Sequence, residues 1–338
     1  MNALFDPRPG RHVALALICA ALWLGLPLVV AQPYVLHVMI LIAIYSTFAI
    51  GWNLVTGFVG LKTFGHHALF ALAAYGSALL SKGFGLSPWI TMWAGALLAT
   101  VIGLLVALPA LRIRSVAHVA IVTLAFAEIV RITLSNLKDI TRGEMGLVGI
   151  PPFDPVHLPY LGKIAFSGSM RLPFFYLASL VTIGAFLAVY GLMRSRVGLA
   201  FVALRNSQDA AESLGLNLAR YKFLAFGISA FIVGLAGVLY AHYIRVLTPH
   251  SVAGMDVMIL VIAMVLVGGI GTHAGPLVGA VALIGVAEAL RGIGEYRLLT
   301  YGALIILVTL FHPKGLVSLA TRAAATLAAR RGERTEAA

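Results

Sequence analysis

Long uninterrupted runs of apolar residues recur along almost the whole chain. A helix crosses the hydrocarbon core of a bilayer with roughly 20 apolar residues, because each residue adds about 1.5 Å along the helix axis. Runs of about that length follow one another here, separated by segments that carry most of the charge. Only 11% of the residues are charged, whereas soluble domains carry about a quarter. The pattern predicts an all-α polytopic membrane protein and excludes a soluble globular fold.

The apolar runs predict about ten transmembrane helices in a single membrane domain, residues 1–320, followed by a polar tail, residues 321–338. The short third, eighth, ninth and tenth runs meet the length requirement least well. The expected spans are residues 12–31, 35–56, 64–81, 88–110, 116–135, 173–193, 222–243, 256–270, 275–290 and 297–311.

The distribution of Lys and Arg predicts the orientation of these spans. An even number of spans places both termini on one side, together with the basic loop 194–222. The opposite side receives the loop 136–172, whose charges are mixed. Because cytoplasmic loops carry an excess of Lys and Arg, we expect both termini and loop 194–222 to be cytoplasmic. The net charge of +12 then reflects membrane orientation, and no nucleic-acid partner is expected.

The external loop 136–172 is rich in glycine and proline and too long for a simple connection. Its apolar residues predict that it packs over the external mouth of the helix bundle. These residues are Leu147, Ile150, Phe153, Leu158 and Tyr160.

The cytoplasmic loop contains a short helix with clear end signals, over about 208–214. Ser207 is a favourable N-cap, and Asp209 and Glu212 lie in or near the first turn, where the helix dipole favours negative charge. Gly215 follows the helix, where a left-handed C-cap favours a residue without Cβ. We therefore expect a rigid helix at the membrane surface, well suited to receive a push from outside the bundle.

Polar residues within the spans are candidates for a translocation pathway. Glu128 lies near the middle of the fifth span, and Arg131 follows one helical turn later. A charge at this depth costs a few kcal/mol, so it is expected to face protein or water. Either the pair lines a pathway or it is a structural ion pair. Asn53, in the second span, could likewise contact a solute or cap the helix where it is interrupted at Gly57.

The sequence carries no recognisable enzyme motif. It lacks the phosphate-binding loop of nucleotide hydrolases and the nucleophile elbow of serine hydrolases. The spacing of His, Asp, Glu and Cys fits no metal site. The one cysteine, Cys19, cannot form an intrachain disulfide. We expect no catalytic residues, no metal and no cofactor, and any driving ATPase would be a separate chain.

Several motifs closely resemble the LivM-like permeases of branched-chain amino acid ABC importers. The resemblance covers nearly all of the chain after the first span. The motifs are GLAFVALRN at 198–206, AAESLGLN at 210–217, RYK at 220–222, TLAFAEIVR at 123–131 and GGIGTHAGP at 268–276.

The resemblance implies a type II-like ABC importer permease fold in the bacterial inner membrane. It implies a LivH-like permease partner, two cytoplasmic ATPase subunits and a periplasmic solute-binding protein. The short loop helix would be the coupling helix that docks on an ATPase, with Arg205, Asp209, Glu212 and Gly215 at the matched positions. Lys62 departs from the family pattern.

His67 and the segment 142–147 also depart from that pattern, which leaves the solute open. Relatives of the family carry branched-chain amino acids, urea and short amides, or aromatic acids. An ion-coupled secondary transporter, with Glu128 as a proton relay, is the alternative from another functional class.

Overall fold

The computed structural model is made almost entirely of helices. It describes residues 20–27, 32–112, 115–158, 162–166, 171–289, 302–303, 306–307, 310 and 315–318. Residues 20–27 are helical, but most of the predicted first and tenth spans and the whole predicted tail 321–338 lie outside the described residues.

The main helices follow the predicted spans closely. They are α2 (Pro33–Asn53), α3 (His66–Phe84), α4 (Pro88–Arg112), α5 (Val116–Asn136), α7 (Leu172–Met193), α10 (Leu218–Ile244), α12 (Met255–Gly268) and α13 (Gly275–Ala289). Shorter helices are η2 (Leu54–Phe58), α6 (Lys138–Thr141), η3 (Gly143–Met145), α8 (Arg196–Asn206), α9 (Gln208–Ser213) and α11 (Pro249–Ala253). Six helices among the described residues are long and apolar enough to cross a membrane, and α13 is a shorter apolar helix.

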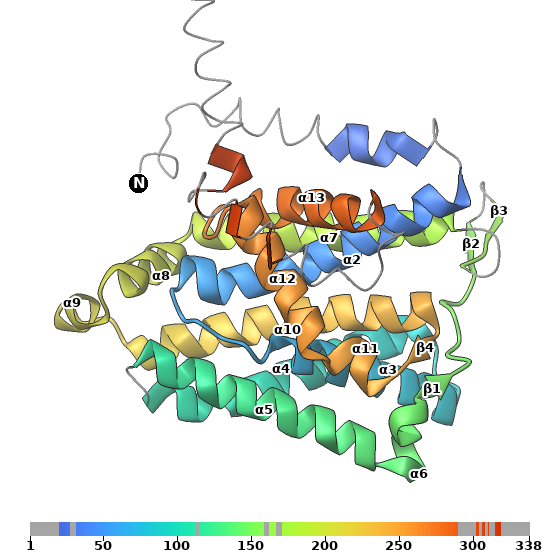
Figure 1. Cartoon of the computed structure of the whole chain (residues 1–338), viewed down its shortest axis with the longest axis horizontal. Helices are drawn as coiled ribbons and strands as arrows, with labels where there is room; N and C mark the ends of the chain where they lie inside the picture. Colours follow the sequence, from blue (N-terminus) through green and yellow to red (C-terminus); the bar gives the residue numbers. More distant parts are fainter. Residues whose placement is uncertain are drawn as a thin grey trace, which may run out of the picture.

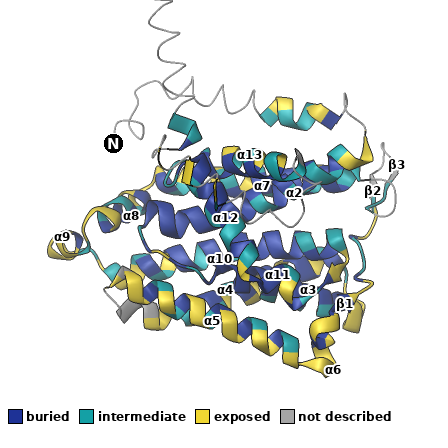
Figure 2. Cartoon of the chain, in the orientation of Figure 1, coloured by how far each residue is buried: buried dark blue, intermediate teal, exposed yellow. Residues whose placement is uncertain are grey.

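Helix α10 lies at the centre of the bundle, packed against α2, α3 and α4 (Figures 1 and 2). Glycines bring its backbone close to its neighbours. A Cβ on Gly237 would overlap the carbonyl oxygen of Phe70 in α3, and one on Gly234 would lie 2.9 Å from the Cα of Ala96 in α4. Small residues allow this close approach between helices in membranes. The outer helices α4 and α5 expose many of their residues (Figure 2).

The two ends of the bundle differ in structure. Helices α8 and α9 project from one end, and α6 and the short strands lie at the other (Figure 1). Strand β1 (Leu147–Val148) pairs antiparallel with β4 (Val246–Leu247), and β2 (Val156–Leu158) pairs with β3 (Gly162–Ile164). The pairing of β1 with β4 joins the loop after α5 to the segment that follows α10.

The long loop after α5 packs onto the bundle, as the sequence predicts. Leu147, Ile150 and Phe153 are buried, whereas the side chains of Leu158 and Tyr160 lie outside the described part of the chain. Phe153 contacts the ring of His242, whose Nδ1 lies 2.7 Å from the carbonyl oxygen of Pro151.

Candidate functional site

Helix α9 begins with the predicted N-cap. The side chain of Ser207 accepts a hydrogen bond from the backbone N–H of Ala210 at 3.2 Å, which satisfies one of the free amides of the first turn. Asp209 lies in that turn, where the helix dipole stabilises its negative charge. The helix covers Gln208–Ser213, close to the predicted range of 208–214.

The C-terminus of α9 forms the glycine cap that the sequence predicts. Gly215 has φ +81°, a conformation that costs a residue with a Cβ about 1–2 kcal/mol. Its N–H donates to the carbonyl of Glu212 at 2.9 Å, and the N–H of Leu216 donates to that of Ala211 at 3.1 Å. This pair of bonds is a Schellman motif. Both ends of this six-residue helix are therefore fixed.

A partly buried side-chain hydrogen bond joins α9 to the start of α10. The Nζ of Lys222, at the start of α10, donates to the Oε1 of Gln208 at 2.8 Å. Lys222 is buried, as is Ala211 on the inner side of α9, whereas Leu214 is 82% exposed. One face of α9 is thus anchored and the opposite face is open to a partner.

A second helix in this segment, α8, was not predicted. Its N-cap is Ser195, whose side chain accepts from the N–H of Val197 at 3.2 Å, and its buried face includes Phe201 and Leu204. This serine and the apolar spacing were the available signals. Of the four residues predicted for the coupling helix, Arg205 belongs to α8 and precedes α9.

Asn53 lies at the end of α2 and is 1% exposed. Its Nδ2 donates to the carbonyl of Thr272 at 3.0 Å, and its Oδ1 accepts from the N–H of Gly271 at 2.9 Å. Both partners lie in the turn between α12 and α13, residues 269–274, which we call the α12–α13 turn. Both polar atoms of the Asn53 amide are therefore bonded within the protein. They fix the turn that separates α12 from α13.

Aromatic side chains surround the same turn. The ring of His273 lies 4.9 Å from that of Phe58 and 5.1 Å from that of Tyr190, between ring centroids. Burial lowers the pKa of His273 to about 4, and the positive charge of Arg194 acts in the same direction. His273 is therefore uncharged at neutral pH.

A cavity of about 10 Å³ lies beside the turn, which is room for about one water molecule. It is too small for an amino acid. Its lining residues are Ile50, Asn53, Phe58, Phe186, Val189, His273 and Pro276.

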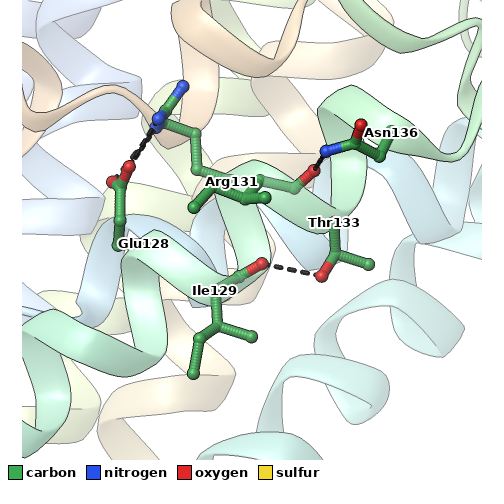
Figure 3. A network of polar contacts seen from close by, with 6 residues as sticks. Glu128, Ile129, Arg131, Thr133 and Asn136 are labelled. Atoms are coloured by element: carbon green, nitrogen blue, oxygen red, sulfur yellow. Dashed lines mark hydrogen bonds and ion pairs between the residues drawn. The ribbon is translucent and has the colours of Figure 1, made fainter.

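Glu128 and Arg131 form an ion pair along α5 (Figure 3). The Nε of Arg131 donates to both carboxylate oxygens at 3.0 Å, and its Nη2 also bonds to Oε1. The side chains are 52% and 32% exposed, respectively, on the surface of the chain. Both residues belong to the same helix, so their bond does not tie α5 to another helix.

The structure thus divides the predicted site residues into three groups. Asp209 and Glu212 lie in α9, and Gly215 follows it. Arg205 and Asn53 meet at the α12–α13 turn, while Glu128 and Arg131 lie on the outer face of α5. Sequence reasoning missed Gly271 and Gly60 as partners of Arg205. Their φ angles are +70° and +83°. The sequence shows only that both residues are glycine, and not that Arg205 contacts them.

The comparison with known proteins covers most of the chain. Residues 34–309 match the family model described as the branched-chain amino acid transport system permease component. The chain is 34% identical to the high-affinity branched-chain amino acid transport system permease protein LivM of Escherichia coli, over 87% of this chain and 73% of that protein.

Two further relatives are more distant. The corresponding permease protein LivH of Salmonella typhimurium is 29% identical over 81% of this chain and 91% of its own length. The guanosine ABC transporter permease protein NupQ of Bacillus subtilis is 28% identical over 70% of this chain and 75% of its own. The chain therefore belongs to the family of branched-chain amino acid transport system permease components.

Proposed function

We propose that this chain is the membrane-spanning permease subunit of an ATP-binding cassette importer that carries branched-chain or related amino acids across the bacterial inner membrane. The observation that carries the proposal is the double-capped helix α9, which projects beyond the bundle (Figure 1) in a chain of this permease family. A helix with both ends fixed transmits a displacement without deforming.

The partners we propose are a LivH-like permease subunit, two cytoplasmic ATPases and a periplasmic solute-binding protein. The excess of Lys and Arg in the loop 194–222 and at the termini favours a cytoplasmic location for these segments. ATP would then be hydrolysed on the partner ATPases, and this chain would have no catalytic residues.

Asp209 and Glu212 in α9, and Gly215 just after it, are the residues that we propose for docking on an ATPase. Asp209 and Glu212 are exposed, and the neighbouring Leu214 exposes most of its surface. An exposed apolar side chain next to acidic groups fits a groove with a hydrophobic floor and basic walls. Gly215 fixes the end of the helix so that Leu214 keeps its position.

The outer face of α5 is proposed to meet the second permease subunit, with the pathway along the seam. Ile121, Ile129 and Ile132 are 65%, 63% and 47% exposed on this helix, and Glu128 and Arg131 lie among them. An ion pair facing lipid would be costly. A protein partner or a water-filled pathway would remove that cost.

Transport by the reconstituted complex tests the proposal. Proteoliposomes with the four kinds of subunit should take up solute only with ATP, and uptake should survive collapse of the proton gradient. Uptake that needs the proton gradient, or that proceeds without the ATPases, would instead identify an ion-coupled secondary transporter.

The solute is identified by which compound stimulates ATP hydrolysis through its binding protein. The panel should contain leucine, isoleucine and valine, with urea, short amides and aromatic acids as the alternatives. Guanosine belongs in it because of the similarity to NupQ. Stimulation by the branched-chain amino acids alone is the expected result.

Glu128→Gln tests the pathway. If Glu128 lines the seam, uptake should fall while the complex remains assembled. Asp139→Asn, exposed on helix α6, is the matched control. Unchanged uptake together with a lower thermal stability would show that the ion pair is structural.

A further inference from the structure

The α12–α13 turn is bound to the end of α2 through a close backbone contact. Asn53 bonds to both Gly271 and Thr272, as described above. A Cβ on Gly57 would lie 2.7 Å from the backbone nitrogen of Gly271, and one on Gly271 would lie 2.8 Å from the carbonyl oxygen of Gly57. The turn can approach η2, which continues α2, this closely only because both positions are glycine.

Arg205, near the end of α8, contacts the same turn at Gly271, on the side that faces Gly57. Its backbone and stem cover Gly60, where an added Cβ would be 3.2 Å from its Cα and 3.1 Å from its Cγ. Its guanidinium reaches Gly271, where an added Cβ would overlap Nη1. One side chain of the cytoplasmic segment thus touches both the chain after η2 and the α12–α13 turn.

The turn itself is braced internally by two hydrogen bonds of the Thr272 side chain. The Oγ1 of Thr272 donates to the carbonyl of Gly269 at 2.7 Å and accepts from the N–H of Gly275 at 3.0 Å. A displacement applied at Gly271 reaches the first residue of α13, Gly275, through these bonds. It also reaches α2 through Asn53.

We propose that Arg205 is the positioning residue through which movement of α8 and α9 reaches the α12–α13 turn and Asn53. This inference rests on the proposed function, because the force on α9 would come from the docked ATPase. The role given to Arg205 differs from docking, because Arg205 contacts Gly271 within this chain and does not bind the ATPase. Asn53 then completes the connection to α2.

The first measurement follows the turn itself. Amide hydrogen exchange of the peptide that contains Gly271 and Thr272 should rise about tenfold in Arg205→Ala and in Asn53→Ala, and less in Arg205→Lys, which keeps the charge but not the planar guanidinium. Arg196→Ala, an exposed arginine at the start of α8, is the matched control and should leave exchange unchanged. Wild-type exchange in Arg205→Ala would overturn the contact.

The second measurement follows coupling in the reconstituted complex. Arg205→Ala should lower the amount of solute carried per ATP hydrolysed about fivefold or more. Asn53→Ala should do the same, and the double variant should lose little beyond either single variant, because both act on one turn. Additive losses, or an unchanged ratio, would overturn the inference.

ATPase binding distinguishes the inference from its closest alternative. Loss of ATPase binding in Arg205→Ala would show that Arg205 acts in docking, and the inference would fall. If the wild-type complex neither hydrolyses ATP nor carries solute, the proposed function fails instead, and the exchange measurement still decides whether Arg205 holds the turn.

Discussion

Replacing Gly215 by alanine perturbs α9 at a single defined point. The residue has φ +81°, and no atom lies within 4 Å of the position that a Cβ would take. The substitution therefore causes no clash, and its cost is the conformational cost of a left-handed alanine, about 1–2 kcal/mol. A free-energy change of that size alters a population about 5- to 30-fold.

The expected effect is a lower affinity of the permease for the ATPase proposed to dock on α9. The capped form of α9 becomes less populated, so the affinity for the ATPase should fall by up to that factor, with a matching fall in solute-stimulated ATP hydrolysis. Binding of the purified ATPase to the permease in nanodiscs measures this directly. Gly215→Asn should retain most of the affinity, because asparagine tolerates the left-handed region better.

Gly85→Ala is the matched control. Gly85 also caps a helix, α3, with φ +65° and open space around its Cβ position, but it lies before α4 and away from α9. It should carry a similar local cost and leave ATPase binding unchanged. The reasoning is refuted if Gly215→Ala binds as well as the wild type, or if both alanines weaken binding equally.

Three further substitutions test the packing. Phe153→Ala removes a buried ring that contacts Trp89 and Phe174, should cost about 3–5 kcal/mol, and should loosen the loop after α5, measurable as faster proteolysis there. Gly237→Ala sets a methyl group against the carbonyl of Phe70 and should abolish stable assembly, measurable by size-exclusion chromatography, whereas Gly184→Ala, with open space, should not. The free energy of unfolding should fall by at most about 3 kcal/mol from pH 6.5 to 4. The reason is that burial lowers the pKa of folded His273 to about 4, whereas the unfolded chain binds this proton already near pH 6.5. His273→Gln should remove this part of the pH dependence, and an unchanged profile would contradict the lowered pKa.

Features that depend on neighbours in the sequence could be predicted. The apolar runs placed the long apolar helices within a few residues, because burial in a membrane demands a fixed length. These helices are α2, α3, α4, α5, α7, α10, α12 and α13. The ends of α9 were predicted correctly, since Ser207 and Gly215 act on amides and carbonyls of the same turn. The packing of the loop after α5 was confirmed for Phe153.

Features that join distant segments could not be predicted. Asn53 bonds to residues more than 200 positions away, and Arg205 touches Gly271 from another helix. A single sequence gives the polarity of Asn53 and the flexibility of the glycines but not their pairing. The outward direction of Glu128 was equally hidden, because helical spacing does not tell which face meets the bundle.

The glycine contacts of α10 have a consequence for how the protein can move. Where the backbones of α10, α3 and α4 touch, no side chain can rotate to make room, so a sliding step would require atoms to overlap. Those three helices must therefore tilt together, as one solid body. Rearrangement is left to the contacts that longer side chains make elsewhere in the bundle.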